Sequence, residues 1–231
     1  GDALAFDAML HFATAIAVVV YFWGDIWLLI QTLLRMLGRM PVNSKEKTLL
    51  YALIIGTIPA VILGLLLESY MESAFRSPLL VAGVLVAGSF LFMYAEYVYA
   101  RRRGDGKMTV GKGLTIGFFQ SLALIPGMSR SGASISGGML LGLSRVEAAR
   151  FSFLLAVPVI LGAGSKKFLE LMTSDVAVSW TPIALGAVTA FIVGMLAIHF
   201  MLSFVRRHSL WPFIWYRIIL AMFVVLVVSF G

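Results

Sequence analysis

A single arginine stands inside a segment of small residues near the middle of the sequence. The segment ALIPGMSRSGASISGG covers residues 123–138, and Arg130 is the one charged residue between Lys112 and Arg145. An arginine side chain keeps its proton in proteins, so its burial leaves a positive charge that needs a partner. Because no Asp or Glu lies nearby in sequence, the pattern favours an anion that comes from outside the chain.

The residues around Arg130 carry the groups that bind an oxyanion. A guanidinium matches a phosphate with two parallel hydrogen bonds, and a helix beginning near Gly132 would direct its partly positive N-terminus at the same anion. Serine hydroxyls and the accessible backbone N–H groups of glycines would complete the cradle, and these residues are Ser129, Ser131, Ser134, Gly127 and Gly132. An anion site with apolar walls indicates a phosphorylated lipid.

Two other interpretations of this segment stay open at the level of the sequence. Arg130 could pair with a distant carboxylate, Glu96 or Glu170, in which case the small residues only allow helices to pack closely. A serine could act as a nucleophile, but a serine nucleophile needs a base, and no His or acidic residue stands within the motif.

The composition of the chain predicts the kind of fold that holds this segment. Of the 231 residues, 61% are hydrophobic and 13% are charged, whereas soluble domains have roughly 25% charged residues. The mean hydropathy is +0.98, and apolar runs of about 20 residues are long enough to cross a bilayer. The sequence therefore predicts an all-α polytopic membrane protein that forms a single integral membrane domain over residues 1–231.

About six transmembrane helices are expected, together with a shorter amphipathic helix at about 25–40 that would lie in the membrane interface. The expected spans are residues 4–23, 48–67, 79–99, 151–171, 182–204 and 212–230.

The net charge of +7 comes from Lys and Arg residues that cluster between the apolar runs, as the positive-inside rule expects. We therefore predict membrane lipid, and no nucleic acid, as the partner of these residues. The sequence contains no cysteine, which excludes a thiolate metal site and a cysteine nucleophile.

Residues 113–144 do not fit a simple transmembrane helix. As one straight helix, the segment would extend about 48 Å at 1.5 Å per residue, and Pro126 and Gly127 interrupt it near the middle. Basic residues flank it on both sides, so it should enter and leave on one face. The sequence predicts a re-entrant hairpin at about 112–143, with helices at about 112–124 and 132–143. Such a tip is tolerated only where protein or a wet cavity surrounds it.

Two longer stretches resemble a known family. FFQSLALIPGMSRSGASISGGMLLGLSR, followed by ARFSFLLAVPVILGAG, resembles the undecaprenyl-diphosphatases, and the similarity runs through essentially the whole chain. The resemblance implies a multi-pass enzyme of the bacterial plasma (inner) membrane that hydrolyses undecaprenyl diphosphate to undecaprenyl phosphate and inorganic phosphate. This reaction recycles the lipid carrier for peptidoglycan synthesis, and it confers resistance to bacitracin.

The resemblance also implies roles for particular residues. Arg130 and Ser129 match the catalytic positions of the family's second signature, with Arg130 binding phosphate and stabilising the transition state. Ser131 belongs to the same signature, and Gln120 stands where a glutamate falls in the first signature. Gln120 is therefore expected to bind phosphate with the serines and glycines of the cradle.

The family's first signature, with its two glutamates, has no match in residues 1–231. The family fold consists of inverted repeats with two re-entrant hairpins, so we expect this chain to hold the second hairpin and to lack an N-terminal segment with the first. A divalent cation, Mg²⁺ or Ca²⁺, is implied by the resemblance alone, with its ligands in that absent segment. The chain by itself is then expected to be inactive, and a homodimer stays open.

Transport is the alternative function. A flippase or carrier for an anionic isoprenoid-phosphate lipid could hold the headgroup at a broken helix near the membrane midplane. Phosphate release would distinguish hydrolysis from transport.

Overall fold

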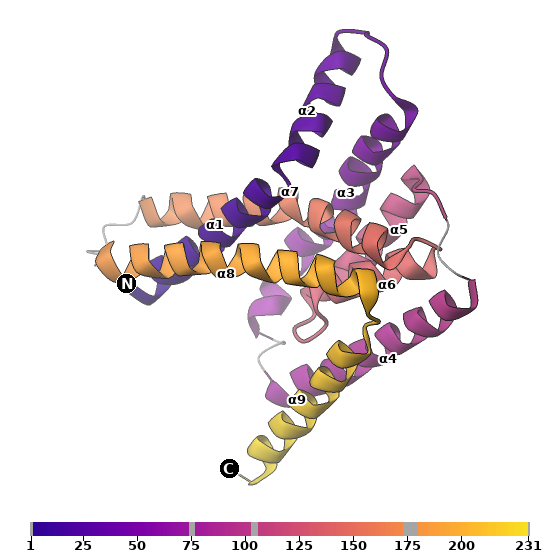
Figure 1. The fold of residues 1–231 in the computed structure, drawn as a ribbon. Helices are drawn as coiled ribbons and strands as arrows, with labels where there is room; N and C mark the ends of the chain where they lie inside the picture. Colours follow the sequence, from indigo (N-terminus) through magenta and orange to yellow (C-terminus); the bar gives the residue numbers. More distant parts are fainter. Residues whose placement is uncertain (1, 74–76, 103–105, 173–179, 231) are drawn as a thin grey trace. The chain divides into compact units, whose positions relative to one another are not determined.

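The computed structural model describes residues 2–73, 77–102, 106–172 and 180–230, and these residues form α-helices joined by short connections (Figure 1). The helices are α1 Asp2–Tyr21, α2 Trp23–Leu37, α3 Ser44–Ser73, α4 Pro78–Arg102, α5 Val110–Ser121, α6 Arg130–Leu140, α7 Arg145–Met172, α8 Trp180–Arg207 and α9 Trp211–Phe230.

The predicted class of fold is confirmed. Among the described residues, five helices are long and apolar enough to cross a membrane. A sixth span results if Met9–Tyr21 and Trp23–Leu37, which are bent by 75° relative to each other, form one broken span. The protein is therefore an all-α, polytopic membrane protein, and α2 coincides with the amphipathic segment predicted at about 25–40.

Several helices begin before the apolar runs that predicted them, because their first turns are polar. α7 begins at Arg145, and not at 151. Its start is fixed by a capping box, in which the Ser144 hydroxyl accepts from the backbone N–H of Glu147 at 3.2 Å, and the Glu147 carboxylate accepts from the N–H of Ser144 at 3.1 Å. This reciprocal pair satisfies two N–H groups that the helix itself leaves unpaired.

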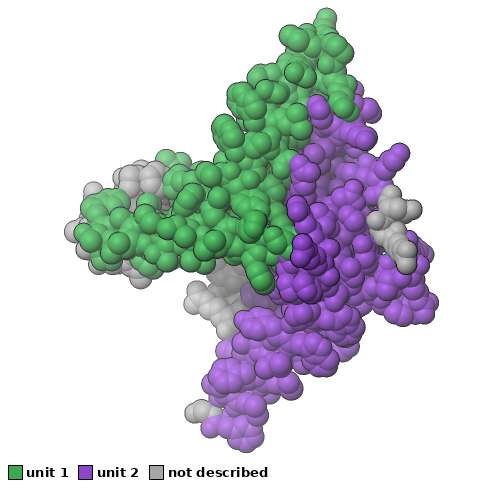
Figure 2. Space-filling view, in the orientation of Figure 1, with its two compact units in different colours: residues 1–43, 153–203 green, residues 44–152, 204–231 purple. Residues whose placement is uncertain are grey.

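The chain divides into two compact units, which Figure 2 shows in different colours. The first consists of residues 1–43 and 153–203, and the second of residues 44–152 and 204–231. In the first unit, the Tyr21 hydroxyl lies 3.3 Å from Nδ1 of His199. The ring of Phe22 also stacks on Phe153, with 5.8 Å between the centroids. The division by itself leaves the single membrane domain a prediction.

The second unit holds the segment around Arg130, and its closest helix pair is α3 with α5. Gly113 and Gly117 on α5 face Ala52 and Gly56 on α3. A Cβ atom at Gly117 would lie 2.0 Å from the backbone oxygen of Gly56, and one at Gly113 would lie 2.6 Å from the oxygen of Ala52. Small residues four apart on both helices thus allow the two backbones to touch, which is a common way for helices to associate in membranes.

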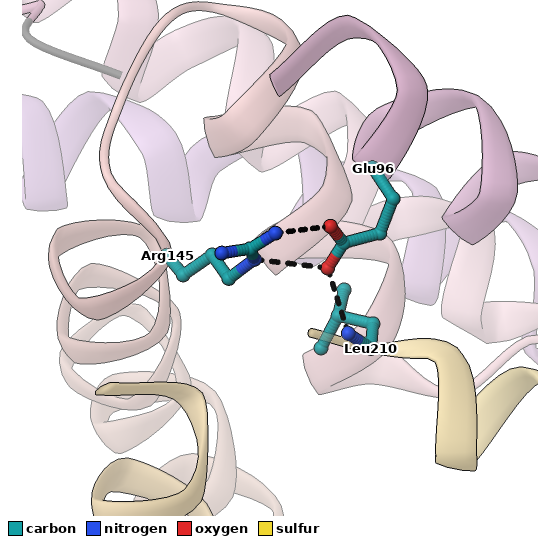
Figure 3. A network of polar contacts seen from close by, with 3 residues as sticks. All are labelled: Glu96, Arg145 and Leu210. Carbon is teal, nitrogen blue, oxygen red and sulfur yellow. Dashed lines mark hydrogen bonds and ion pairs between the residues drawn. The ribbon is translucent and has the colours of Figure 1, made fainter. Parts of the chain in front are cut away.

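A buried carboxylate ties three further parts of the second unit together (Figure 3). Glu96 on α4 accepts from Nε of Arg145 at 3.0 Å, and its second oxygen accepts from Nη2 of the same guanidinium. The backbone N–H of Leu210, just before α9, donates to Glu96 at 2.7 Å. Since α4 and α9 also lie side by side (Figure 1), this network fixes the starts of α7 and α9 against α4.

The Glu96 network is expected to be important for stability. Glu96→Ala leaves the Arg145 guanidinium without its carboxylate, and removal of one partner of a buried pair costs about 3–5 kcal/mol. Because Arg145 keeps some access to solvent, we expect the lower end of that range. Thermal unfolding in detergent measures the loss. Glu147→Gln, which changes an exposed cap on α7, is the control, and an equal effect of both changes would contradict the expectation.

Candidate functional site

The segment that holds Arg130 is a short helical hairpin. α5 ends at Ser121, a 3₁₀ turn follows over Leu122–Leu124, and α6 begins at Arg130. The sequence predicted helices at about 112–124 and 132–143. The structure has the break between them at the predicted place, around Pro126 and Gly127. The depth of this hairpin in a bilayer stays a prediction.

The turn between the two helices has an unusual backbone. Gly127 has φ +95°, and Ser129 has φ +69° although it carries a side chain. A non-glycine residue in such a conformation costs on the order of 1–3 kcal/mol, and it persists only where its surroundings hold it. The turn places Ser129 as the N-cap of α6, where its hydroxyl accepts from the backbone N–H of Gly132 at 3.3 Å. The strained residue therefore lies directly before Arg130.

Arg130 is the first residue of α6, and its side chain is half-buried. Within the part of the chain that the structure describes, its guanidinium makes no hydrogen bond and no ion pair with another residue. Glu96, one of the two carboxylates considered as its partner from sequence, binds Arg145 and Leu210 instead. The side chain of the other, Glu170, lies outside the described part of the structure. The charge of Arg130 thus stands at a helix N-terminus, which itself favours anions.

The predicted site residues form an accessible group at the turn and a buried group on α6. In the accessible group, Ser129 is exposed, while Arg130, Ser131 and Gly127 are half-buried. Gly132 is buried, and its backbone N–H is bound by Ser129. Ser134 is buried further along α6, where its hydroxyl donates to the Arg130 carbonyl at 2.8 Å and lies 2.5 Å from the Ser152 hydroxyl.

Gln120, on the last turn of α5, is buried with 2% exposure. Neither its amide oxygen nor its amide nitrogen has a hydrogen-bond partner among the described residues, and the same holds for the Ser136 hydroxyl of α6. Buried polar groups in proteins are nearly always bonded. These groups are therefore available to a ligand or to water.

Sequence reasoning missed Ser136 and also Arg217, which lies on α9 and contacts the turn. The Nη2 atom of Arg217 donates to the Gly127 carbonyl at 2.8 Å. A signal was present, because Arg217 is the one charged residue of the last apolar run, 212–230. A charge in a membrane helix is by default a hypothesis for a functional site.

The described residues do not offer a site for the divalent cation that the resemblance implies. No three His, Asp or Glu side chains of the described residues come together in a group that could hold a metal ion. The polar groups at the turn are hydroxyls, amides and guanidinium groups, and guanidinium groups are donors only.

These features define a class of protein: a polytopic helical membrane protein with a helical hairpin that is broken before α6, where Arg130 carries a guanidinium with no partner among the described residues. The chain belongs to the bacitracin resistance protein BacA family, which it matches over residues 1–223. The resemblance inferred from its motifs is thereby confirmed.

Proteins named undecaprenyl-diphosphatase are similar to almost the whole chain. That of Moorella thermoacetica is 42% identical over 224 residues, which cover 97% of this chain and 83% of the relative. That of Chloroherpeton thalassium is 39% identical over 240 residues, with 98% and 84% covered. Undecaprenyl-diphosphatase 2 of Stutzerimonas stutzeri is 40% identical over 222 residues, with 95% and 82% covered.

Proposed function

We propose that this protein hydrolyses undecaprenyl diphosphate to undecaprenyl phosphate and inorganic phosphate. The reaction would supply lipid carrier for peptidoglycan synthesis and confer resistance to bacitracin, in keeping with the family it belongs to. The observation that carries the proposal is the Arg130 guanidinium, which stands at the N-terminus of α6 with no partner in the described residues and with the exposed Ser129 beside it.

The proposed mechanism uses these groups to bind the terminal phosphate and to stabilise its charge. Arg130 would hold two phosphate oxygens through its fork of N–H groups, and the Ser129 and Ser131 hydroxyls would donate to the remaining oxygen. A water oxygen forms a bond to the terminal phosphorus while the bond to the bridging oxygen breaks. The bridging oxygen leaves with undecaprenyl phosphate, and the water proton passes to solvent. Phosphoryl transfer depends mainly on such positioning and charge neutralisation.

The proposal assigns Gln120 to the same phosphate, and its replacement gives a clear prediction. Gln120→Leu removes two buried groups that have no hydrogen-bond partner in the described part of the chain, so the melting temperature should stay the same or rise. A hydrogen bond to a charged ligand contributes about 1.5–3 kcal/mol, so we expect kcat/KM to fall about 10- to 100-fold.

The matched control for Gln120 is its neighbour Ser121. Its hydroxyl is also buried, but it donates to the backbone oxygen of Gly117 at 3.0 Å. Ser121→Ala should therefore leave kcat/KM within about twofold of the wild type. Full activity in Gln120→Leu would remove Gln120 from the site.

A direct assay separates hydrolysis from transport. The protein, expressed from its complete gene and reconstituted into liposomes, is given an isoprenoid diphosphate, and free phosphate is measured together with the movement of the headgroup across the bilayer. Hydrolysis predicts phosphate release that depends on Arg130. Movement of an intact diphosphate headgroup without phosphate release would instead make the protein a flippase or carrier.

The proposal includes a location in the bacterial plasma membrane and pairing with a second copy. Its support is the apolar surface of the spanning helices, such as Leu185 and Leu196 on α8, which are 66% and 64% exposed. Lipid or a second copy would cover such a surface. Membrane fractionation tests the location, and chemical cross-linking in the native membrane tests the pairing. If only monomers were found after cross-linking, the dimer would be refuted.

A further inference from the structure

Arg217 lies in the second turn of the apolar helix α9 and is 6% exposed. Its Nη2 atom donates to two backbone oxygens, that of Gly127 at 2.8 Å and that of Leu85 at 3.2 Å. Among the described residues it has no carboxylate partner. A charge kept in a membrane helix without a counter-ion calls for an explanation beyond packing.

Arg217 is connected to both ends of the turn before Arg130, directly at one end and through the ring of Phe92 at the other. One end is the Gly127 carbonyl, which Arg217 binds directly. The other end is Gly132, which rests on the ring of Phe92, since a Cβ atom at Gly132 would lie 1.8 Å from the ring carbon Cζ. The Arg217 guanidinium lies over this same ring, 4.9 Å from its centroid. Arg217 and Phe92 therefore contact the segment 127–132 at both of its ends.

A glycine on α4 leaves room for the Arg217 guanidinium. Gly88, one helical turn before Phe92, faces the guanidinium: a Cβ atom at Gly88 would lie 2.3 Å from Nη2 of Arg217 and 3.2 Å from Sδ of Met128. Any larger residue at position 88 would displace the guanidinium from the turn. Gly83 on the same helix has nothing within 4 Å of a Cβ atom.

We propose that Arg217 is a positioning residue, which holds the Gly127–Gly132 turn in the conformation that aims the Arg130 guanidinium at the phosphate. This inference rests on the proposed function. The turn contains Ser129 with φ +69°, a conformation that persists only where neighbouring groups hold it. The Arg217 guanidinium supplies such a constraint, because it bonds both the Gly127 carbonyl of the turn and the Leu85 carbonyl of α4.

Three replacements of Arg217 separate its charge from its hydrogen bonds. Arg217→Met removes both, Arg217→Gln keeps N–H donors without charge, and Arg217→Lys keeps the charge on a flexible stem. A small displacement of a catalytic group can lower the rate about 100-fold, so we expect Arg217→Met to lower kcat about 10- to 100-fold with little change in KM. The Gln and Lys variants should lie between Met and the wild type.

A double-mutant cycle tests whether Arg217 acts through Arg130. If it does, Arg217→Met should cause no further loss of kcat in an Arg130→Ala background, because the group it positions is already gone. Losses that multiply would overturn the inference. Binding gives a readout besides activity: inorganic pyrophosphate should raise the melting temperature of the wild type more than that of Arg217→Met.

Gly88→Ala covers the case in which Arg217→Met does not fold, because it displaces the guanidinium without removing it. It should lower kcat while Gly83→Ala does not, and equal activity of the two variants would overturn the inference. The outcomes also distinguish the two proposals. No phosphate release by the wild type means that the proposed function fails. Release that needs Arg130 but survives Arg217→Met and Gly88→Ala means that the positioning role alone fails.

Discussion

Arg130→Ala is expected to lower kcat/KM for phosphate release by about 1,000-fold or more. Loss of one preorganised donor to a developing oxyanion costs about 100- to 1,000-fold, and an arginine that stabilises phosphoryl transfer contributes about 1,000- to 100,000-fold. Arg130→Lys keeps the charge but loses the planar fork, so it should recover only part of the loss. Phosphate release from an isoprenoid diphosphate in detergent measures both variants.

Stability distinguishes this effect from misfolding. Because the Arg130 side chain has no hydrogen bond or ion pair in the described residues, Arg130→Ala should keep the melting temperature of the wild type. Arg206→Ala, at the exposed end of α8, removes a positive charge away from the turn and should keep full activity. If Arg130→Ala retained more than about a tenth of the activity, Arg130 would not provide the stabilisation proposed here.

Gly117→Ala is expected to have the largest effect on stability. The added methyl group would lie 2.0 Å from the backbone oxygen of Gly56, and no side-chain rotation can relieve a clash with the backbone. Overpacking usually costs about 1–3 kcal/mol, and we expect the upper end or more because α3 and α5 must separate. Loss of folded protein is measured by thermal unfolding in detergent and by yield from the membrane.

Gly111→Ala on the same helix is the matched control. A Cβ atom there has nothing within 4 Å, so the change removes a glycine from a helix and should stabilise the protein by up to about 1 kcal/mol. Equal stability of the two variants would contradict the close contact between α3 and α5.

The sequence contained most of the information for the fold and for the position of the turn. Long apolar runs identify the membrane spans, because a chain that crosses a bilayer must satisfy its backbone hydrogen bonds internally and therefore forms helices or closed barrels. Pro126 with Gly127 marked the break before α6. Helix starts were less well predicted, since polar first turns such as that of α7 carry no hydropathy signal. The Ser144 and Glu147 pair could have corrected that start, because its spacing is a known cap.

Contacts between distant segments could not be predicted in the same way. The small residues at 113 and 117 were visible, but nothing in the sequence indicates that they face Ala52 and Gly56. The role of Glu96 was ambiguous, because a carboxylate can reach either Arg130 or Arg145 and only the folded chain decides. Arg217 was visible as the one charged residue of its apolar run, but its partners are backbone oxygens, which no residue type in the sequence identifies.

The hydrogen bonds from Arg217 to backbone oxygens have a consequence for evolution within the family. Every residue type offers a main-chain carbonyl, so the hydrogen bond from Arg217 places no demand on the side chain at position 85. Statistical methods that infer spatial neighbours from correlated substitutions should therefore fail to identify positions 85 and 217 as neighbours, even though the Arg217 guanidinium donates a hydrogen bond to the Leu85 carbonyl. Selection would act instead on the arginine itself and on the empty space that Gly88 keeps for it.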